Sequence, residues 1–240
     1  MKRRRPVVAI DGPTAAGKST VARGVARRLG LLYVDTGAMY RSVAVTALRR
    51  AIDLGDADAV TRLANSMVIE FRPAGAPAPA GASPSGSGTG DRVLVDGQDV
   101  TEAIRTPEAS DAASRVSVIG GVREAMVARQ RVMGTDGGVV MEGRDIGTVV
   151  FPDADVKVFL KASLETRARR RHAELLARGQ TVDLEEVRRS EAERDRRDET
   201  RTHSPLRPAE GAVVLDTTTT TAEEVAEVIV RIVRERIGVV

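Results

Sequence analysis

Short apolar segments alternate along the chain with segments whose apolar residues recur every three or four positions. The apolar segments are rich in Val, Leu and Ile, as in strands covered on both faces, and they are Val7–Ile10, Leu31–Val34, Gly138–Met141, Val156–Leu160 and Ala212–Leu215. The periodic segments predict amphipathic helices, and the last of them, from Ala222 to Ile237, places Val225, Val228, Ile229 and Ile232 on its buried face. This alternation predicts an α/β fold with a parallel sheet.

The alternation is interrupted between residues 68 and 118. Val68–Phe71 and Arg92–Val95 have the pattern of strands, and Asp96-Gly97 predicts a tight turn into a short third strand. Thr106 followed by Pro107 is typical of a helix start. We therefore expect one domain over residues 1–240 with a small α+β insertion at 68–118. Within the insertion, residues 73–90 contain only Pro, Gly, Ala, Ser and Thr, which predicts a disordered loop.

The segment after the first predicted strand carries the clearest chemistry. Residues 12–19 read Gly-Pro-Thr-Ala-Ala-Gly-Lys-Ser and match G-x-x-x-x-G-K-[ST] at every fixed position. A strand precedes the motif and a helix from Ser19 to Leu29 follows it, which is the context that a phosphate-binding loop requires. Its backbone N–H groups and the helix start would face a polyphosphate. Lys18 would reach the β- and γ-phosphates, and Ser19 could ligate Mg²⁺.

Several predicted strands end in a carboxylate, and these residues are Asp11, Asp35, Glu142 and Asp216. The carboxyl ends of parallel strands line the ligand crevice of doubly wound sheets, so each carboxylate is a candidate site residue or an ordinary loop acid. The loop 142–148 adds Arg144 beside Asp145, and Asp35-Thr36-Gly37 is followed by Arg41 one turn into the next helix. In each pair the arginine could bind a phosphate while the aspartate accepts from a neighbouring hydrogen-bond donor of the ligand.

Residues 162–202 are rich in arginine and predict a helical hairpin. Arg167, Arg170 and Arg171 fall on one side of its first helix. Asp183 predicts the start of the second helix, where Arg194, Arg197, Asp198 and Arg201 share a face with no apolar stripe. Such a helix is either a solvated, salt-bridged surface or faces a ligand. Beside a phosphate-binding loop we favour a mobile lid that closes over the transferring phosphoryl group.

Composition narrows the classes of protein. The formal net charge is +3 although 33 arginines face only four lysines, and there is no cysteine or tryptophan. The modest net charge and the scarcity of aromatic residues argue against a nucleic-acid motor. The absence of cysteine excludes disulfides and thiolate metal sites and fits a cytoplasmic protein. The basic start at residues 2–5 is not followed by an apolar signal region, and no segment has the length of a membrane span. We expect no partner other than small molecules, and a monomer.

Taken together, these motifs resemble the bacterial cytidylate kinase family of P-loop nucleoside monophosphate kinases, over nearly the whole chain. The match rests on residues 10–19, 35–41, 104–108, 112–116, 122–125, 143–152 and 194–201. Two departures are visible, because residues 73–90 form a longer loop than expected and Glu142 replaces an aspartate often found there. The resemblance implies a P-loop core with a five-stranded parallel sheet, an inserted NMP-binding subdomain and an arginine-rich lid. It also implies transfer of the ATP γ-phosphoryl group to CMP or dCMP with Mg²⁺.

Site residues follow from the motif and the resemblance. The ATP-binding residues are Gly12, Pro13, Thr14, Ala15, Ala16, Gly17, Lys18, Ser19 and Thr20. The resemblance implies contacts to CMP from Asp35, Thr36, Arg41, Ser114, Arg123, Arg144, Asp145, Arg194, Asp198 and Arg201. The catalytic set is Lys18, Arg41, Arg144, Arg170, Arg171 and Arg201, with Ser19 toward the metal. Among the lid arginines, which also include Arg167 and Arg194, the sequence does not rank those that touch the γ-phosphate.

Other activities leave different marks on a sequence. A P-loop kinase with a different nucleotide acceptor is the nearest alternative. A shikimate-type site would carry Asp-x-Asp after the second strand, where this chain has Asp35-Thr36-Gly37. A GTPase would carry an Asn-Lys-x-Asp guanine motif, and the sequence has none. The sequence therefore favours a nucleoside monophosphate kinase.

Overall fold

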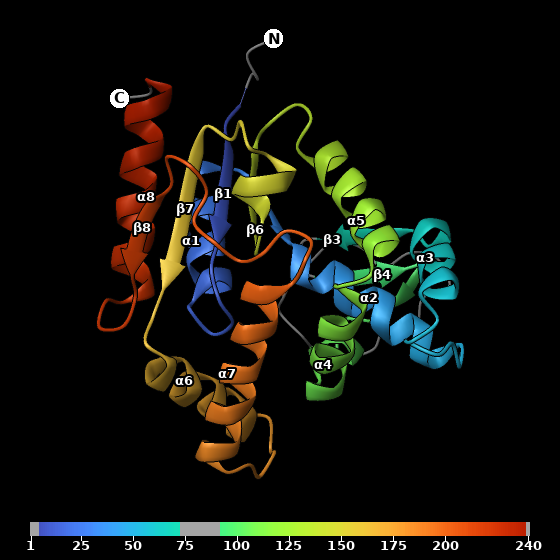
Figure 1. Cartoon of the computed structure of the whole chain (residues 1–240). Helices are drawn as coiled ribbons and strands as arrows, with labels where there is room; N and C mark the ends of the chain where they lie inside the picture. The colour runs from blue at the N-terminus through green and yellow to red at the C-terminus, as the bar shows by residue number, and fades with distance from the viewer. Residues whose placement is uncertain (1–4, 73–91, 239–240) are drawn as a thin grey trace. The chain divides into compact units, whose positions relative to one another are not determined.

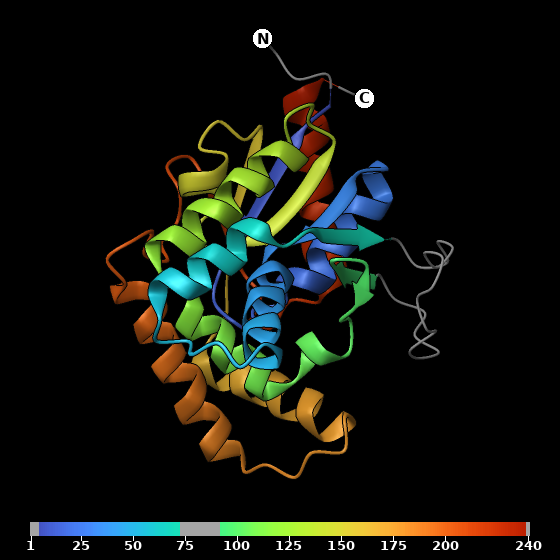
Figure 2. The ribbon, with the colours of Figure 1, turned by 90° about the vertical axis from the view of Figure 1, so that its right-hand side faces the viewer.

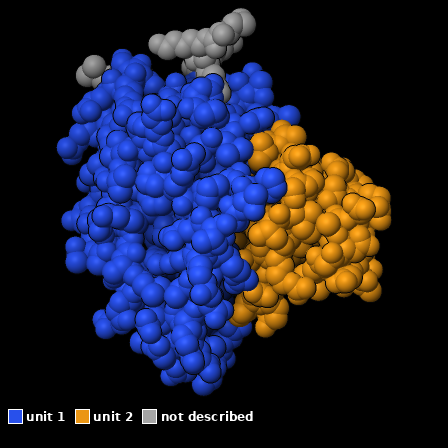
Figure 3. All heavy atoms as spheres, in the orientation of Figure 1, with its two compact units in different colours: residues 1–35, 130–240 blue, residues 36–129 orange. Residues whose placement is uncertain are grey.

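The computed structural model describes residues 5–72 and 92–238 and contains two compact units. One unit comprises Met1–Asp35 and Gln130–Val240, and the other comprises Thr36–Arg129 (Figure 3). The loop predicted at 73–90 and the start of the basic segment at 2–5 lie outside the described residues. The second unit starts and ends outside the limits 68–118 predicted for the insertion, because helices on both sides of the insertion pack with it.

The first unit is built on a five-stranded parallel sheet (Figure 1). Its strands are β1 (Val7–Asp11), β2 (Leu32–Asp35), β6 (Val139–Gly143), β7 (Val156–Lys161) and β8 (Val213–Asp216). They lie in the order β2-β6-β1-β7-β8, and each neighbouring pair is parallel. Strand β2, which follows β1 in the chain, lies on one side of β1 in the sheet, and β7 lies on the other side. The carboxyl end of β1 is therefore the switch point where such sheets bind ligands.

Two helices cover one face of this sheet. They are α1 (Lys18–Leu29) and α8 (Ala222–Ile237), which pack on each other and on the strands. Val21 and Val25 of α1 meet Val225 and Ile229 of α8 in a core without exposed side chains. The predicted span of α8 is confirmed, but Val228 is exposed, and Val230 and Val233 complete the buried stripe instead. Thr221 and Glu224 form a capping box at its start.

The remaining elements of the first unit connect the sheet to the arginine-rich segment. A short π-helical turn, η2 (Ile146–Val150), follows β6. The helices α6 (Leu164–Ala177) and α7 (Leu184–Thr200) follow β7 and pack on each other as a hairpin. The Asp183 side chain accepts from Glu185 and Glu186 N–H, so the predicted start of α7 is confirmed.

The second unit is built on a three-stranded antiparallel sheet with the order β3-β4-β5. Its strands are β3 (Ile69–Arg72), β4 (Arg92–Val95) and β5 (Gln98–Asp99), and Figure 2 shows β3 beside β4. Asp96 and Gly97 both have positive φ, at 50° and 79°, so the predicted tight hairpin turn is confirmed. The helices are α2 (Thr36–Arg49), α3 (Ala57–Ser66), η1 (Ala103–Arg105), α4 (Pro107–Val116) and α5 (Gly120–Met133), whose last four residues belong to the first unit.

Helix α4 shows how local sequence sets an element boundary. The Thr106 hydroxyl accepts from Ala109 N–H, and Pro107 occupies the first helical position, as predicted. Ala112, Ala113 and Val116 are buried, and α4 packs against α2. No helix within residues 5–72 and 92–238 is long and apolar enough to cross a membrane.

Candidate active site

The loop between β1 and α1 has the backbone conformation of a phosphate-binding loop. Gly12 has a φ of 151° and Gly17 a φ of 87°, and Ala15 between them lies at 57°. A Cβ atom on Gly12 would lie 2.2 Å from the carbonyl oxygen of Leu160, so only glycine fits there. Residues 12–17 therefore wrap closely between the ends of β1 and β7 and the start of α1.

Lys18 is the first residue of α1 and is almost fully buried, with 7% of its surface exposed. Its Nζ atom donates to the carbonyl oxygen of Pro13 at 2.6 Å. Burial, and after it the positive charge of Arg144, lower the pKa of Lys18 to about 7. A cation held this way gains from the arrival of a polyanion, because phosphate oxygens would replace the solvation that burial removed.

Three oxygen-bearing side chains gather around the start of α1. Asp35 is the last residue of β2, Glu142 is the last but one of the neighbouring strand β6, and the two are paired in register. Glu142 is 3% exposed and is hydrogen-bonded to the Ser19 side chain and to the hydroxyl of Tyr33. Burial, and after it the charge of Asp35, raise the pKa of Glu142. Hydroxyl and carboxylate oxygens are the ligands that Mg²⁺ uses together with nucleotide phosphates.

The other two strand-end carboxylates have structural partners. Asp11 is buried, and its two oxygens accept from Ile146 N–H and Gly147 N–H, each at 2.8 Å. Burial raises the pKa of Asp11 to about 6 although both hydrogen bonds favour the charged form. Asp216 is exposed and accepts from Thr218 N–H. Asp11 thus fixes the loop that carries Arg144 and Asp145 against the end of β1.

Arg144 joins three parts of the first unit. It follows β6, its Nε atom donates to Asp198 Oδ2 on α7 at 2.8 Å, and an Nη2 hydrogen bond of 2.5 Å reaches the Thr14 hydroxyl. Burial raises the energy of both charges, but their mutual attraction outweighs it and holds the pKa of Asp198 below its usual range. The predicted residues Arg144 and Asp198 are therefore together, and Arg144 contacts the phosphate-binding loop.

Arg167 on α6 is buried and connects α6 with α7. Its guanidinium binds Asp195 of α7 through two hydrogen bonds, and it lies 3.8 Å from Glu191. It also donates to the carbonyl oxygen of Thr14 at 3.4 Å. Only 4% of Arg167 is exposed, so its guanidinium is committed to protein partners. Among the arginines of residues 162–202, this residue holds the α6–α7 hairpin together.

Arg170 and Arg171 differ in their surroundings. Arg170 donates to the hydroxyl and the carbonyl oxygen of Thr217, at 3.1 and 2.5 Å. The Thr217 hydroxyl in turn donates to the carbonyl oxygen of Ala16 in the phosphate-binding loop. Arg171 forms an ion pair with Glu174 of the same helix. Arg170 is therefore connected to the loop through one residue.

Arg194 and Arg201 lie on the α7 side of this cluster. The charge of Arg194 acts on both Lys18 and Asp198 and contributes to the lowered pKa of each group. Arg201 is the residue that caps the end of α7, and its Nε atom donates to Ser204 O at 2.6 Å. Asp145 is buried next to Asp11. Lys18, Arg144, Arg194 and Asp198 thus form one electrostatic group.

The second unit holds four of the predicted residues. Thr36 opens α2 and is buried, and Arg41 lies one turn further along the same helix. Arg123 of α5 is 5% exposed, donates to Ser117 O, and has its Cζ atom 6.0 Å from the ring of Tyr40. Ser117 in turn donates to the carbonyl oxygen of Ser114 on α4. Arg123 and Ser114 are therefore close to each other within this unit.

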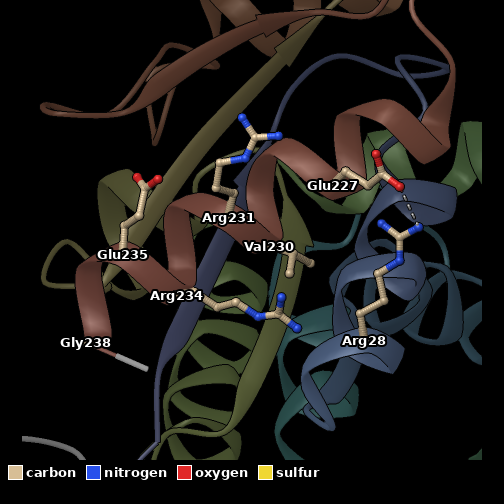
Figure 4. A pocket seen from close by; sticks show the side chains of 7 residues that line it. All are labelled: Arg28, Glu227, Val230, Arg231, Arg234, Glu235 and Gly238. Atoms are coloured by element: carbon tan, nitrogen blue, oxygen red, sulfur yellow. Dashed lines mark ion pairs between the residues drawn. The ribbon is translucent and has the colours of Figure 1, made fainter. Parts of the chain in front are cut away.

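A surface hollow of about 770 Å³ lies between α1 and α8, and Figure 4 shows Arg28 facing Arg234 and Val230 across it. Its lining is charged in both signs, and Arg28 lies 3.7 Å from Glu227. Arg28 follows Lys18 by ten residues on α1, which corresponds to about 15 Å along a helix. The hollow is therefore separate from the phosphate-binding loop.

Tyr33, Asp195 and Thr217 contact site residues although no sequence motif marks them. The spacing of Glu191 and Asp195 by four residues matches that of Arg167 and Arg171, and this signal predicts pairing between two antiparallel helices. Glu142 is one of the strand-end carboxylates but is not among the residues predicted to bind substrate, although it contacts Ser19. Tyr33 reads as an ordinary strand residue, and only the sheet order reveals its partner.

Comparisons with known proteins agree with this geometry. A family model described as cytidylate kinase matches residues 8–235. A cytidylate kinase of Geobacillus kaustophilus is 51% identical over 236 residues, which are 98% of this chain and 100% of the relative. One from Solibacter usitatus is 49% identical over 238 residues, covering 98% and 95%.

Some relatives are longer than this chain. A bifunctional pantoate ligase/cytidylate kinase of a Synechococcus strain is 50% identical over 232 residues, which are 97% of this chain. The chain spans 41% of that relative's length.

Proposed function

The chain belongs to the cytidylate kinase family, and from this premise we propose that it transfers the γ-phosphoryl group of ATP to CMP or dCMP, giving ADP and CDP or dCDP. A phosphate oxygen of the acceptor attacks the γ-phosphorus, and the bond from that phosphorus to the β–γ bridging oxygen breaks. The electron pair stays on ADP. The acceptor oxygen is already an anion, so no general base is required.

The phosphate-binding loop and Lys18 hold the phosphoryl donor. Backbone N–H groups of residues 12–17 face the β-phosphate, and Lys18 leaves Pro13 O for the β- and γ-phosphate oxygens. Ser19, with Glu142 and Asp35 next to it, would hold Mg²⁺, which neutralises phosphate charge when it is bound. Their all-oxygen chemistry fits that ion. The described residues contain no cluster of three or more acidic, histidine or cysteine side chains for a metal, so the nucleotide would supply further ligands.

The bridge from Thr14 through Arg144 to Asp198 is the observation that best supports this proposal. It places a guanidinium between the loop for the donor and the lid helix α7. An arginine there can bind the transferring group or the acceptor phosphate and neutralise charge in the transition state. Arg170, Arg171, Arg194 and Arg201 supply further positive charge from the lid, and Arg41 supplies it from α2.

Side chains that suit a cytidine monophosphate occur within each unit. Ser114 and Arg123 offer donors for the O2 and N3 atoms of cytosine, and Asp145 offers an acceptor for its N4 amino group. Thr36, Arg41 and Arg144 suit the monophosphate and sugar. Arg194 and Arg201 suit the phosphates, and the carboxylates of Asp35 and Asp198 suit hydroxyl groups of the sugar. Uracil reverses the polarity at N3 and at the 4-position, so buried groups would stay unpaired and UMP would be a poor substrate.

An acceptor panel tests the proposal. ADP release in a coupled assay is measured with MgATP and CMP, dCMP, UMP, AMP or shikimate. We expect CMP and dCMP to be turned over at least about a hundredfold more efficiently than UMP, because a site built on hydrogen bonds rejects the mismatched base. If CMP produces no more ADP than buffer, the proposal is wrong. Preference for UMP or AMP would favour the nearest alternative, a kinase with another nucleotide acceptor.

A further inference from the structure

Tyr33 lies on the edge strand β2 and contacts the candidate metal site. Its hydroxyl donates to Glu142 Oε1 on the neighbouring strand β6, with 2.5 Å between the oxygen atoms. Asp35, two residues later on β2, is paired in register with Glu142. Since side chains two residues apart on a strand point to the same face, all three side chains lie on one side of the sheet. That side is covered by α1.

Two residues of helix α1 contact the side chains of Tyr33 and Glu142. The Ser19 side chain is hydrogen-bonded to Glu142. Arg23, four residues later, has its Cζ atom 4.9 Å from the centre of the Tyr33 ring. Residues four apart share a helix face, so the same face of α1 places Ser19 on the carboxylate and Arg23 on the ring. A guanidinium at this distance attracts the ring and restricts its rotation.

Resting on the proposed function, we propose that Tyr33 is a positioning residue that holds the Glu142 carboxylate in the orientation needed by Ser19 and the Mg²⁺ of MgATP, and that Arg23 fixes the Tyr33 ring. A buried carboxylate with one oxygen bound to Tyr33 has few orientations left. Its remaining lone pairs then face Ser19. Without the hydroxyl, the carboxylate turns toward other partners, and the oxygen set around the ion is no longer preorganised.

Tyr33→Phe is the variant that isolates this effect, because it keeps the ring under Arg23 and removes only the hydroxyl. The dissociation constant for ATP is measured by calorimetry with saturating Mg²⁺ and again with EDTA. We expect MgATP to bind about tenfold more weakly than in the wild type, the scale found when the partner of a metal ligand is removed. ATP in EDTA should bind within about twofold of the wild type, because the phosphate-binding loop is unchanged.

A pair of arginine variants completes the test. Arg23→Met keeps the apolar stem and removes the charge over the ring, and it should weaken MgATP binding about two- to threefold. Arg27→Met, at an exposed position one turn further along α1, is the matched control and should leave both constants unchanged.

Two results would overturn the inference. One is Mg²⁺-dependent binding of Tyr33→Phe equal to that of the wild type. The other is an equal loss with and without Mg²⁺, which would indicate general damage to the loop. Neither readout requires CMP. An inactive wild type with a shifted Mg²⁺ dependence in Tyr33→Phe would therefore refute only the proposed function, and an active wild type with no such shift only the role of Tyr33.

Discussion

Arg144 and Asp198 are 54 positions apart in the chain, yet the Nε atom of one donates to Oδ2 of the other at 2.8 Å. The same guanidinium reaches the Thr14 hydroxyl. The end of β6, helix α7 and the phosphate-binding loop therefore meet at one side chain. The two substrates of the proposed reaction would compete with Asp198 and Thr14 for this guanidinium, so we expect its hydrogen bonds to change when nucleotides bind.

Arg144→Lys tests whether the fork geometry of this guanidinium is required. A lysine keeps the charge but cannot direct donors to Asp198 and Thr14 together, so we expect kcat/KM for CMP to fall about a hundredfold. The KM for ATP should change less than about threefold, because the loop amides and Lys18 bind most of the triphosphate. Steady-state kinetics with each substrate varied in turn measures both. Arg188→Lys, at an exposed ion pair on α7, is the control. An unchanged kcat/KM would show that charge alone suffices.

Arg167→Leu should destabilise the protein rather than act on the chemistry directly. The substitution leaves Asp195 without the guanidinium that binds it and removes one of the cations around the buried Glu191, and breaking a buried pair in this way costs about 3 kcal/mol. Urea denaturation of the nucleotide-free protein measures the loss. Arg169→Leu removes an exposed pair with Glu165 on the same helix and should cost less than about 0.5 kcal/mol. A stable Arg167→Leu protein with a strongly reduced kcat would instead place Arg167 on the substrate.

Lys18→Met should raise the stability of the nucleotide-free protein while it removes activity. The folded pKa of Lys18 is about 7, below the value of about 10.4 in an unfolded chain. Between these values the unfolded state binds more protons, so the stability of the wild type rises with pH, and the penalty of the buried charge is complete below pH 7. We expect Lys18→Met to be more stable by about 2 kcal/mol at pH 6 and by less at pH 9. Its kcat should fall at least about a hundredfold.

Lys157 provides the matched control for this experiment. Its Nζ atom donates to the carbonyl oxygen of Pro152, also five residues earlier, but this hydrogen bond is exposed and Lys157 is only partly buried. Lys157→Met should therefore show neither the gain in stability nor the dependence of that gain on pH. Denaturant unfolding at pH 6 and pH 9 measures the free energy of unfolding of both variants and the wild type. A Lys18→Met protein less stable than the wild type at pH 6 would mean that the ammonium group is stabilised by its neighbours.

The sequence predicts what depends on neighbours along the chain. Strand–helix alternation, the caps at Thr106 and Asp183 and the turn at Asp96 are local, and the structure confirms them. The contacts that build the site connect distant segments. Tyr33 meets Glu142 only because β2 pairs with β6, and parallel pairing between these strands leaves no mark in either segment. The distant partners of the arginines in residues 162–202 cannot be predicted from the sequence either. Nearly every one of these arginines also has a carboxylate within one helical turn, which is an equally plausible partner.

The two glycines of the phosphate-binding motif should differ in what they tolerate. Both have positive φ, so alanine is strained at either position. At Gly17 the added methyl group would meet no atom within 4 Å, and the backbone strain alone should cost about 1 kcal/mol. At Gly12 it would lie 2.2 Å from Leu160 O, so β1 and β7 must also separate where the loop begins. We expect a loss of at least about 3 kcal/mol for Gly12→Ala.

Nucleotide binding separates the two effects further. Gly17→Ala keeps the path of the loop and should bind MgATP within about tenfold of the wild type, whereas Gly12→Ala displaces the amides and should show no saturable binding. Thermal unfolding and calorimetry on both variants give the comparison. If Gly12→Ala were as stable as Gly17→Ala and still bound MgATP, then the carbonyl group of Leu160 would be free to move, and the close approach of β7 to the loop would not be what requires glycine at position 12.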